Sequence, residues 1–216
     1  MSSWPLETRV RVILGPPLSA PPAQGGLIPV KLRYCLLLLT LMALAPPLHA
    51  ATEAEDGLRV CVNYGCKAKR NIPLQGDEWK QVEALFSQPS SDAAEERRRI
   101  GQAVGLMERH AGGITGTSAD RGRNNATGTK GQLDCIAEST NSDRYLRLFE
   151  AKGWLKWHGV GERVKRSPWI FDVHWTAVIE ERPGGKRYAV DSWFFDNGHP
   201  AHIQPLEDWF RKLDPP

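Results

Sequence analysis

The order of helix-like and strand-like segments constrains the fold of this chain more than any other feature. Apolar residues recur at helical spacing in 77–86 and again in 92–109, and the second helix is expected to end at 110–113. Beyond it, β-branched and aromatic residues separated by Gly, Pro and charged turns predict three strands, at 154–157, 169–179 and 186–195. Helices followed by strands predict an α+β domain with an antiparallel sheet rather than a parallel βαβ fold.

The region before residue 51 resembles an export signal. Two cations, Lys31 and Arg33, precede an apolar run at 34–45 that ends in small residues. This run is shorter than the roughly 20 residues that a membrane-spanning helix needs. We therefore expect a signal peptide at 30–50 and a single exported domain at 51–216, periplasmic or secreted, without an integral membrane span.

Residues 1–29 do not resemble the usual lead of an export signal, because they are rich in Pro and small residues. We interpret them as a non-native or disordered extension, with Val30 as the candidate start residue.

The formal net charge of +3 does not indicate an acidic partner. Four of the 28 Lys and Arg residues and one of the 25 Asp and Glu residues precede residue 51, which leaves 24 of each sign and no net charge. We therefore predict no nucleic-acid partner, and the sequence leaves the oligomeric state open.

Three of the four cysteines lie beyond the expected signal peptide. Cys61 and Cys66 enclose Asn63 and Gly65, which favour a tight turn, so we expect a disulfide in an oxidising compartment. Redox motifs space their cysteines by two residues rather than four, which argues against a catalytic dithiol. Cys135 is left as a single thiol.

Cys135 follows a Gly- and Thr-rich loop at 112–132 and begins a helical segment, with an interruption expected at 140–142 and an end at Lys152-Gly153. The unsatisfied N–H groups and the positive dipole end of a helix start favour a thiolate and can hold an oxyanion. A lone cysteine is nevertheless more often a small buried hydrophobe, so the assignment depends on partner residues.

Two partner residues come from the predicted hairpin. If 181–184 forms the turn, Glu180 pairs with Gly185 and His174 lies directly opposite Asp191. Opposed residues share a face with Cβ atoms roughly 5 Å apart, which suits an imidazole and its orienting carboxylate. A slip by one residue would instead bring Ser192 opposite the histidine.

Together these residues fit the roles of a cysteine-nucleophile triad. Cys135 would attack an acyl carbon, His174 would take the thiol proton, and Asp191 would fix the imidazole tautomer. The oxyanion would bind the backbone N–H of Cys135 and a second donor, for which Gln132 is the candidate.

The order Cys135, Gly153, His174-Trp175 and Ala189-Val190-Asp191 resembles the transglutaminase-like branch of the papain-type cysteine enzymes, which includes bacterial periplasmic cysteine proteinases. The resemblance covers about 130–195. It implies a Cys-bearing helix packed on an antiparallel sheet, with the cysteine as nucleophile, the histidine as base and the aspartate as third member. Asp134 departs from the family pattern, and we expect its carboxylate to point away from the sulfur.

The sequence therefore predicts an exported cysteine hydrolase or acyl transferase that acts on peptide or amide bonds of a peptide or protein substrate through a thioester. Neither a cofactor nor a metal is expected. Water as acceptor would make it a protease or amidase, and an amine would make it a transglutaminase, a choice that the sequence leaves open.

Two other functions compete with this one. His199 and His202, with His158 or His110, would supply metal ligands, but they lack the helical pairing of zinc hydrolases. The second alternative is a non-catalytic peptide-binding or structural protein on the same fold, whose groove would be lined by the six tryptophans between Trp154 and Trp209.

Overall fold

The computed structural model describes residues 57–124, 129–167, 173–182 and 184–216, which belong to one compact unit. The extension expected at 1–29, the signal peptide expected at 30–50 and the first four residues, 169–172, of the strand expected at 169–179 lie outside the described residues. None of the helices described is both long enough and apolar enough to cross a membrane.

Three longer helices carry most of the α structure: α2 (Asp77–Leu85), α3 (Ala93–Thr115) and α4 (Cys135–Ala151). Helix α3 begins after Asp92, whose side chain accepts a hydrogen bond from the N–H of Glu95. The expected end at 110–113 is wrong, because the helix continues to Thr115 and stops at Gly116, which adopts a left-handed conformation with φ of 85°.

Helix α4 runs without the interruption expected at 140–142. The polar side chains at 140–142 form hydrogen bonds that are compatible with the helix. The Thr140 hydroxyl donates to the Ile136 carbonyl at 2.5 Å, and the Asn141 amide binds both the N–H (2.6 Å) and the carbonyl (3.0 Å) of Cys61. The Thr140 contact lies within the helix, and the Asn141 contacts attach α4 to the N-terminal hairpin.

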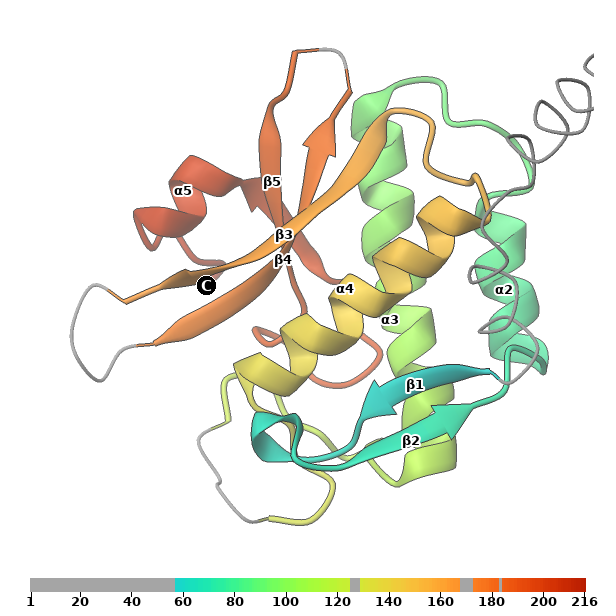
Figure 1. Cartoon of the computed structure of the whole chain (residues 1–216), viewed down its shortest axis with the longest axis vertical. Helices are drawn as coiled ribbons and strands as arrows, with labels where there is room; N and C mark the ends of the chain where they lie inside the picture. Colours follow the sequence, from blue (N-terminus) through green and yellow to red (C-terminus); the bar gives the residue numbers. More distant parts are fainter. Residues whose placement is uncertain (1–56, 125–128, 168–172, 183) are drawn as a thin grey trace, which may run out of the picture. The chain divides into compact units, whose positions relative to one another are not determined.

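One sheet of four antiparallel strands has the order β3-β4-β5-β6 (Figure 1). Its strands are β3 (His158–Arg166), β4 (His174–Glu181), β5 (Arg187–Asp191) and β6 (His202–Pro205), and helix α5 (Leu206–Phe210) follows. The strand expected at 154–157 is wrong. The buried carboxylate of Glu96 accepts the N–H groups of Lys156 and Trp157, so this stretch bonds to a side chain instead of a neighbouring strand.

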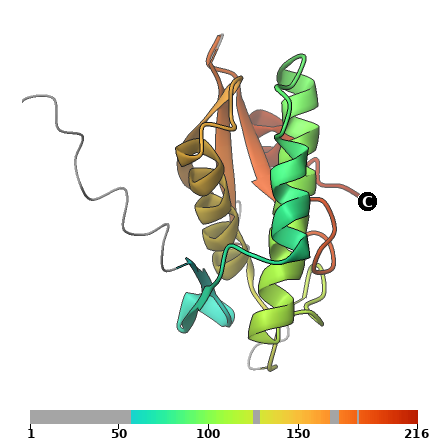
Figure 2. The same ribbon diagram turned by 90° about the vertical axis from the view of Figure 1, so that its right-hand side faces the viewer.

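A separate hairpin precedes the helices, formed by β1 (Leu58–Cys61), the 3-10 turn η2 (Tyr64–Cys66) and β2 (Lys69–Ile72). Cys61 and Cys66 form the expected disulfide, with Cα atoms 4.8 Å apart. The hairpin lies at the end of α4 where that helix begins (Figure 2).

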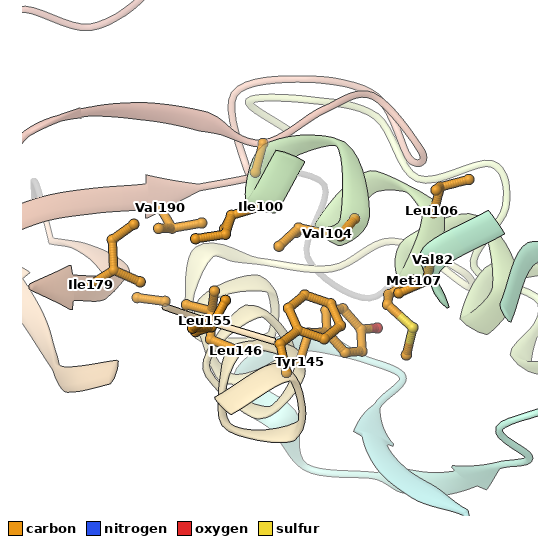
Figure 3. Packing of buried hydrophobic residues seen from close by; sticks show 14 of the residues in the cluster. Val82, Ile100, Val104, Leu106, Met107, Tyr145, Leu146, Leu155, Ile179 and Val190 are labelled. Carbon is orange, nitrogen blue, oxygen red and sulfur yellow. The ribbon is translucent and has the colours of Figure 1, made fainter. Parts of the chain in front are cut away.

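The main core lies between helices α2, α3 and α4 and one face of the sheet (Figure 3). Ile100 and Val104 of α3, and Leu146 of α4, pack with Ile179 and Val190 of the sheet. A smaller cluster covers the opposite face, where Trp209 and Leu206 of α5 meet Val178 and Ala189. The α+β class predicted from the sequence is therefore confirmed.

Candidate active site

The structure brings Cys135, His174 and Asp191 together from three elements. Cys135 is the first residue of α4, His174 the first of β4 and Asp191 the last of β5. His174 Nε2 lies 2.7 Å from Asp191 Oδ2, and the Cys135 thiol lies close enough to the same imidazole to raise its pKa. The sulfur also lies 3.8 Å from the carbonyl oxygen of Val173.

The register that predicted this contact from the sequence is wrong by two residues. Ala177 pairs with Val190 and Glu180 with Arg187, so the continued ladder places Thr176, not His174, opposite Asp191. The hairpin closes between Glu181 and Lys186, because Gly185 adopts a φ of 68° inside the turn. A shift by two leaves both side chains on one face, where the histidine reaches the carboxylate diagonally.

The imidazole is held in one orientation by its surroundings. Because Nε2 faces Asp191, Nδ1 is the ring nitrogen left for the thiol. The ring also lies beside Trp193 and Trp209, with centroids 4.8 and 5.6 Å away. The Trp209 indole N–H donates to Asp191 Oδ2 at 2.8 Å, so this residue from α5 fixes the carboxylate that orients His174. The sequence suggested Trp209 only as one of six tryptophans of a possible groove, not as a partner of Asp191.

Opposing effects set the pKa of His174. Burial favours the neutral imidazole and lowers the pKa, whereas the hydrogen bonds with Asp191 and Cys135 and the charges of both groups raise it. The attractive contacts outweigh burial, and the pKa of His174 rises to about 9. The protonated imidazole is therefore the favoured form at neutral pH, beside the thiol.

Asp134 caps the helix that begins at Cys135. Its Oδ1 accepts the N–H of Ala137 at 2.9 Å, and its Oδ2 accepts the N–H of Gly65 at 2.8 Å. Both carboxylate oxygens are thus bound to backbone donors. The first N–H groups of a helix have no carbonyl partner within that helix. The N–H groups of Cys135 and Ile136 are therefore the donors that an oxyanion would meet at the start of α4.

Gln132, the second oxyanion donor predicted from the sequence, is bound elsewhere. Its buried amide donates to the Ala119 carbonyl at 2.7 Å and accepts the Arg121 N–H at 3.2 Å. These contacts hold the loop before α4, and the oxyanion role of Gln132 stays a prediction without support from them.

The chain was compared with protein-family models, curated proteins and solved structures. No significant match was found in any of the three. The chemistry of the site therefore rests on the geometry of this chain.

A chain of buried carboxyl groups lies behind the cysteine helix. Glu138, one turn after Cys135, accepts the Ser192 hydroxyl at 2.7 Å and contacts both Glu108 and Asp120. Burial is the main cause that raises their pKa values, to about 8 for Glu138, about 7 for Glu108 and about 9 for Asp120. Sequence reasoning missed this group, although Glu138 is one helical turn from Cys135.

The histidines considered as metal ligands are engaged separately. His158 is fully buried and binds Glu96 through Nδ1 at 2.9 Å, whereas His110 Nε2 lies 2.6 Å from the carbonyl of Pro73. His199 is exposed and stacks on Phe195. Within the described ranges, no group of three or more His, Cys, Asp or Glu side chains is arranged to hold a metal ion.

Proposed function

We propose that this chain is an exported cysteine hydrolase or acyl transferase acting on peptide or amide bonds. The observation that carries the proposal is the single imidazole that is bonded to a buried carboxylate and lies beside a free thiol. A thiol at a helix start beside such a histidine has the groups required for nucleophilic catalysis.

The reaction follows from the positions of these groups. The imidazole of His174 holds the thiol proton, and the Cys135 sulfur attacks the carbonyl carbon while first-turn N–H groups of α4 stabilise the oxyanion. The C–N bond then breaks, the amine leaves with the proton from His174, and a thioester remains. Water or an amine attacks the thioester, gives up a proton to His174 and releases the thiol.

Two further features support the wider proposal. The cysteine helix α4 packs on an antiparallel sheet, the arrangement that the resemblance to transglutaminase-like, papain-type enzymes implies. The Cys61–Cys66 disulfide suits an oxidising compartment outside the cytosol, consistent with the export signal proposed for 30–50.

The proposal is tested by alkylating Cys135 with iodoacetamide at pH 6 and identifying the modified peptide by mass spectrometry. An ordinary thiol is almost fully protonated at this pH, whereas a thiol paired with a protonated imidazole reacts as a thiolate. We expect the rate of Cys135 to fall at least about tenfold in His174→Ala.

The matched control is His199→Ala, which removes an exposed histidine and should leave the rate unchanged. Circular dichroism would verify that both variants fold. If wild-type Cys135 reacts no faster than a cysteine in a short peptide, the catalytic function is rejected and the alternative of a non-catalytic peptide-binding protein is favoured.

A further inference from the structure

A hollow of about 540 Å³ lies beside the start of α4. One wall comes from the disulfide hairpin and includes Tyr64, Gly65 and Lys67. The other comes from the chain that leads into α4 and includes Lys130, Gly131 and Asp134. Since Asp134 directly precedes Cys135, the hollow reaches the residue before the candidate nucleophile, which is not itself part of the lining.

The electrostatic surroundings of Tyr64 also connect the hollow with Cys135. Burial raises the pKa of Tyr64 above its ordinary value, and the charges of Asp134, Asp120 and Cys135 raise it further. The thiol is therefore within electrostatic reach of this wall. If the acyl carbon of a substrate lies at Cys135, the part of the substrate next to that carbon would extend into the hollow.

The charges that line the hollow favour an anion. Lys67 and Lys130 come from opposite walls, and within the described ranges neither takes part in an ion pair. Among the described residues of the lining, the one carboxylate is Asp134, which already has both oxygens bound to the N–H groups of Gly65 and Ala137. Among the described residues of the lining, two lysines without an ion pair therefore accompany one carboxylate that is already hydrogen-bonded to backbone N–H groups.

The walls are fixed before a ligand enters. The Cys61–Cys66 disulfide closes the loop that carries one wall, and the Gly65 N–H is tied to Asp134 on the other. The Lys67 side chain runs along Gly65, because a Cβ added to that glycine would lie 3.7 Å from Lys67 Cε. The backbone of both walls is thus tied in place, and the ordering cost on binding falls on the exposed side chains of Lys67 and Lys130.

We propose that this hollow is a substrate subsite for a carboxylate that lies next to the reacting acyl group, held by Lys67 and Lys130. The proposal rests on the function proposed for Cys135. The carboxylate belongs either to an acidic side chain or to the end of a peptide chain. Both sources present the same chemistry to the two lysines, and the experiment distinguishes them.

Three chloroacetyl probes of nearly equal size test the subsite. Chloroacetyl-glutamine amide is neutral. Chloroacetyl-glutamate amide carries a side-chain carboxylate, and chloroacetyl-glutamine carries a terminal carboxylate. In each case the Cys135 sulfur forms a bond to the CH₂ carbon and chloride leaves. We expect at least one acidic probe to react about fivefold faster than the neutral probe at pH 7, an advantage that shrinks in 0.5 M salt.

Lys67→Gln and Lys130→Gln should each reduce this rate ratio about twofold, and the double variant should abolish it. Lys69→Gln, an exposed lysine of the same hairpin that does not line the hollow, should leave it unchanged. The acidic probe that is favoured identifies the source of the carboxylate.

Equal rates for all three probes, or a preference that persists in the double variant, would overturn the subsite. Failure of the proposed function gives a different result, because the neutral probe would then react equally fast with the wild-type protein and with His174→Ala.

Discussion

At the scale of single residues, the orientation of the site depends on one oxygen atom. Asp191 Oδ2 lies 2.7 Å from His174 Nε2 and accepts the Trp209 indole N–H at 2.8 Å. Asp191 is 2% exposed, so water does not compete for this oxygen. Because the carboxylate is anchored from α5, the imidazole that it holds is fixed relative to the thiol.

Asp191→Asn should lower the pKa of His174 from about 9 towards its ordinary value. Burial alone lowers this pKa, and the substitution removes the charge that opposes the effect of burial. NMR titration of the histidine ring protons, with the His174 signal identified by its absence in His174→Ala, measures the change.

Asp196→Asn serves as control, since this exposed carboxylate bonds to Arg121 and Gly122 rather than to the site. A His174 titration near pH 9 that survives in Asp191→Asn would contradict the role given to Asp191.

At the scale of elements, helix α3 is shaped to receive the chain that connects β5 to β6. Gly101 and Gly105 approach Ala201 and His199 so closely that an added Cβ would lie 2.8 and 2.6 Å from their carbonyl oxygens. The connection therefore packs its backbone directly against the helix. This contact places β6 at the edge of the sheet beside β5.

Gly105→Ala should reduce the free energy of unfolding by about 1 to 3 kcal/mol, because a methyl group cannot fit against the His199 carbonyl without moving backbone. Gly113→Ala in the same helix is the matched control. Nothing lies within 4 Å of its added Cβ, and alanine should stabilise the helix by about 0.5 to 1 kcal/mol. Urea denaturation of both variants measures the difference, and equal effects would show that the close approach is unimportant.

The elements with strong periodicity could be predicted, and those fixed by tertiary contacts could not. The spacing of Trp79, Val82 and Leu85 predicted α2, which the structure confirms at Asp77–Leu85. The strand expected at 154–157 failed because Glu96, some 60 residues away, binds its N–H groups. Strand β6 is only four residues long and pairs through the close packing of its connection on α3, for which the sequence has no periodic signal.

The candidate site could be predicted in part for a similar reason. The face shared by His174 and Asp191 follows from the alternation of side chains along strands, which tolerates an error of two residues in the register. Trp209 and Glu138 could not be predicted as partners, because their roles depend on how α5 and α3 pack around the site. Local sequence does not encode this packing. Gln132 bonds to its own loop because that loop folds back on the chain leading to α4.

At the scale of the whole molecule, buried carboxyl groups join parts that are far apart in sequence. Glu108 belongs to α3, Asp120 to the following loop and Glu138 to α4, and Ser192 after β5 binds the last of these. The group links both long helices of the core to the end of the strand that carries Asp191. Its protonation state therefore bears on the stability of the entire fold.

The free energy of unfolding should fall as the pH rises from about 5 to about 9. The unfolded chain loses these carboxyl protons near pH 4, whereas the folded chain keeps them to about 7, 8 and 9. The folded state thus binds more protons in this range, which makes the slope negative. His174 acts in the same direction, since the stability from its raised pKa is lost as the pH passes about 9.

Thermal unfolding of wild type and Glu138→Gln at pH 5.5 and pH 8.5 tests this expectation. The variant keeps a hydrogen-bonding amide without a charge, so the loss of stability between the two pH values should shrink by more than about 1 kcal/mol. The exposed substitution Glu83→Gln should not alter the slope. A wild-type protein that gains stability towards pH 8.5 would refute the shared burial of these groups.

Cys135, His174 and Asp191 stand at the ends of α4, β4 and β5, whereas Lys67 and Lys130 are exposed residues between elements. In the proposed enzyme, packed elements would therefore hold the reacting groups, and surface residues would set the substrate preference. Mutation can exchange either lysine without disturbing the residues that determine folding. In the proposed enzyme, substrate preference could thus change by mutation while the reacting groups are retained.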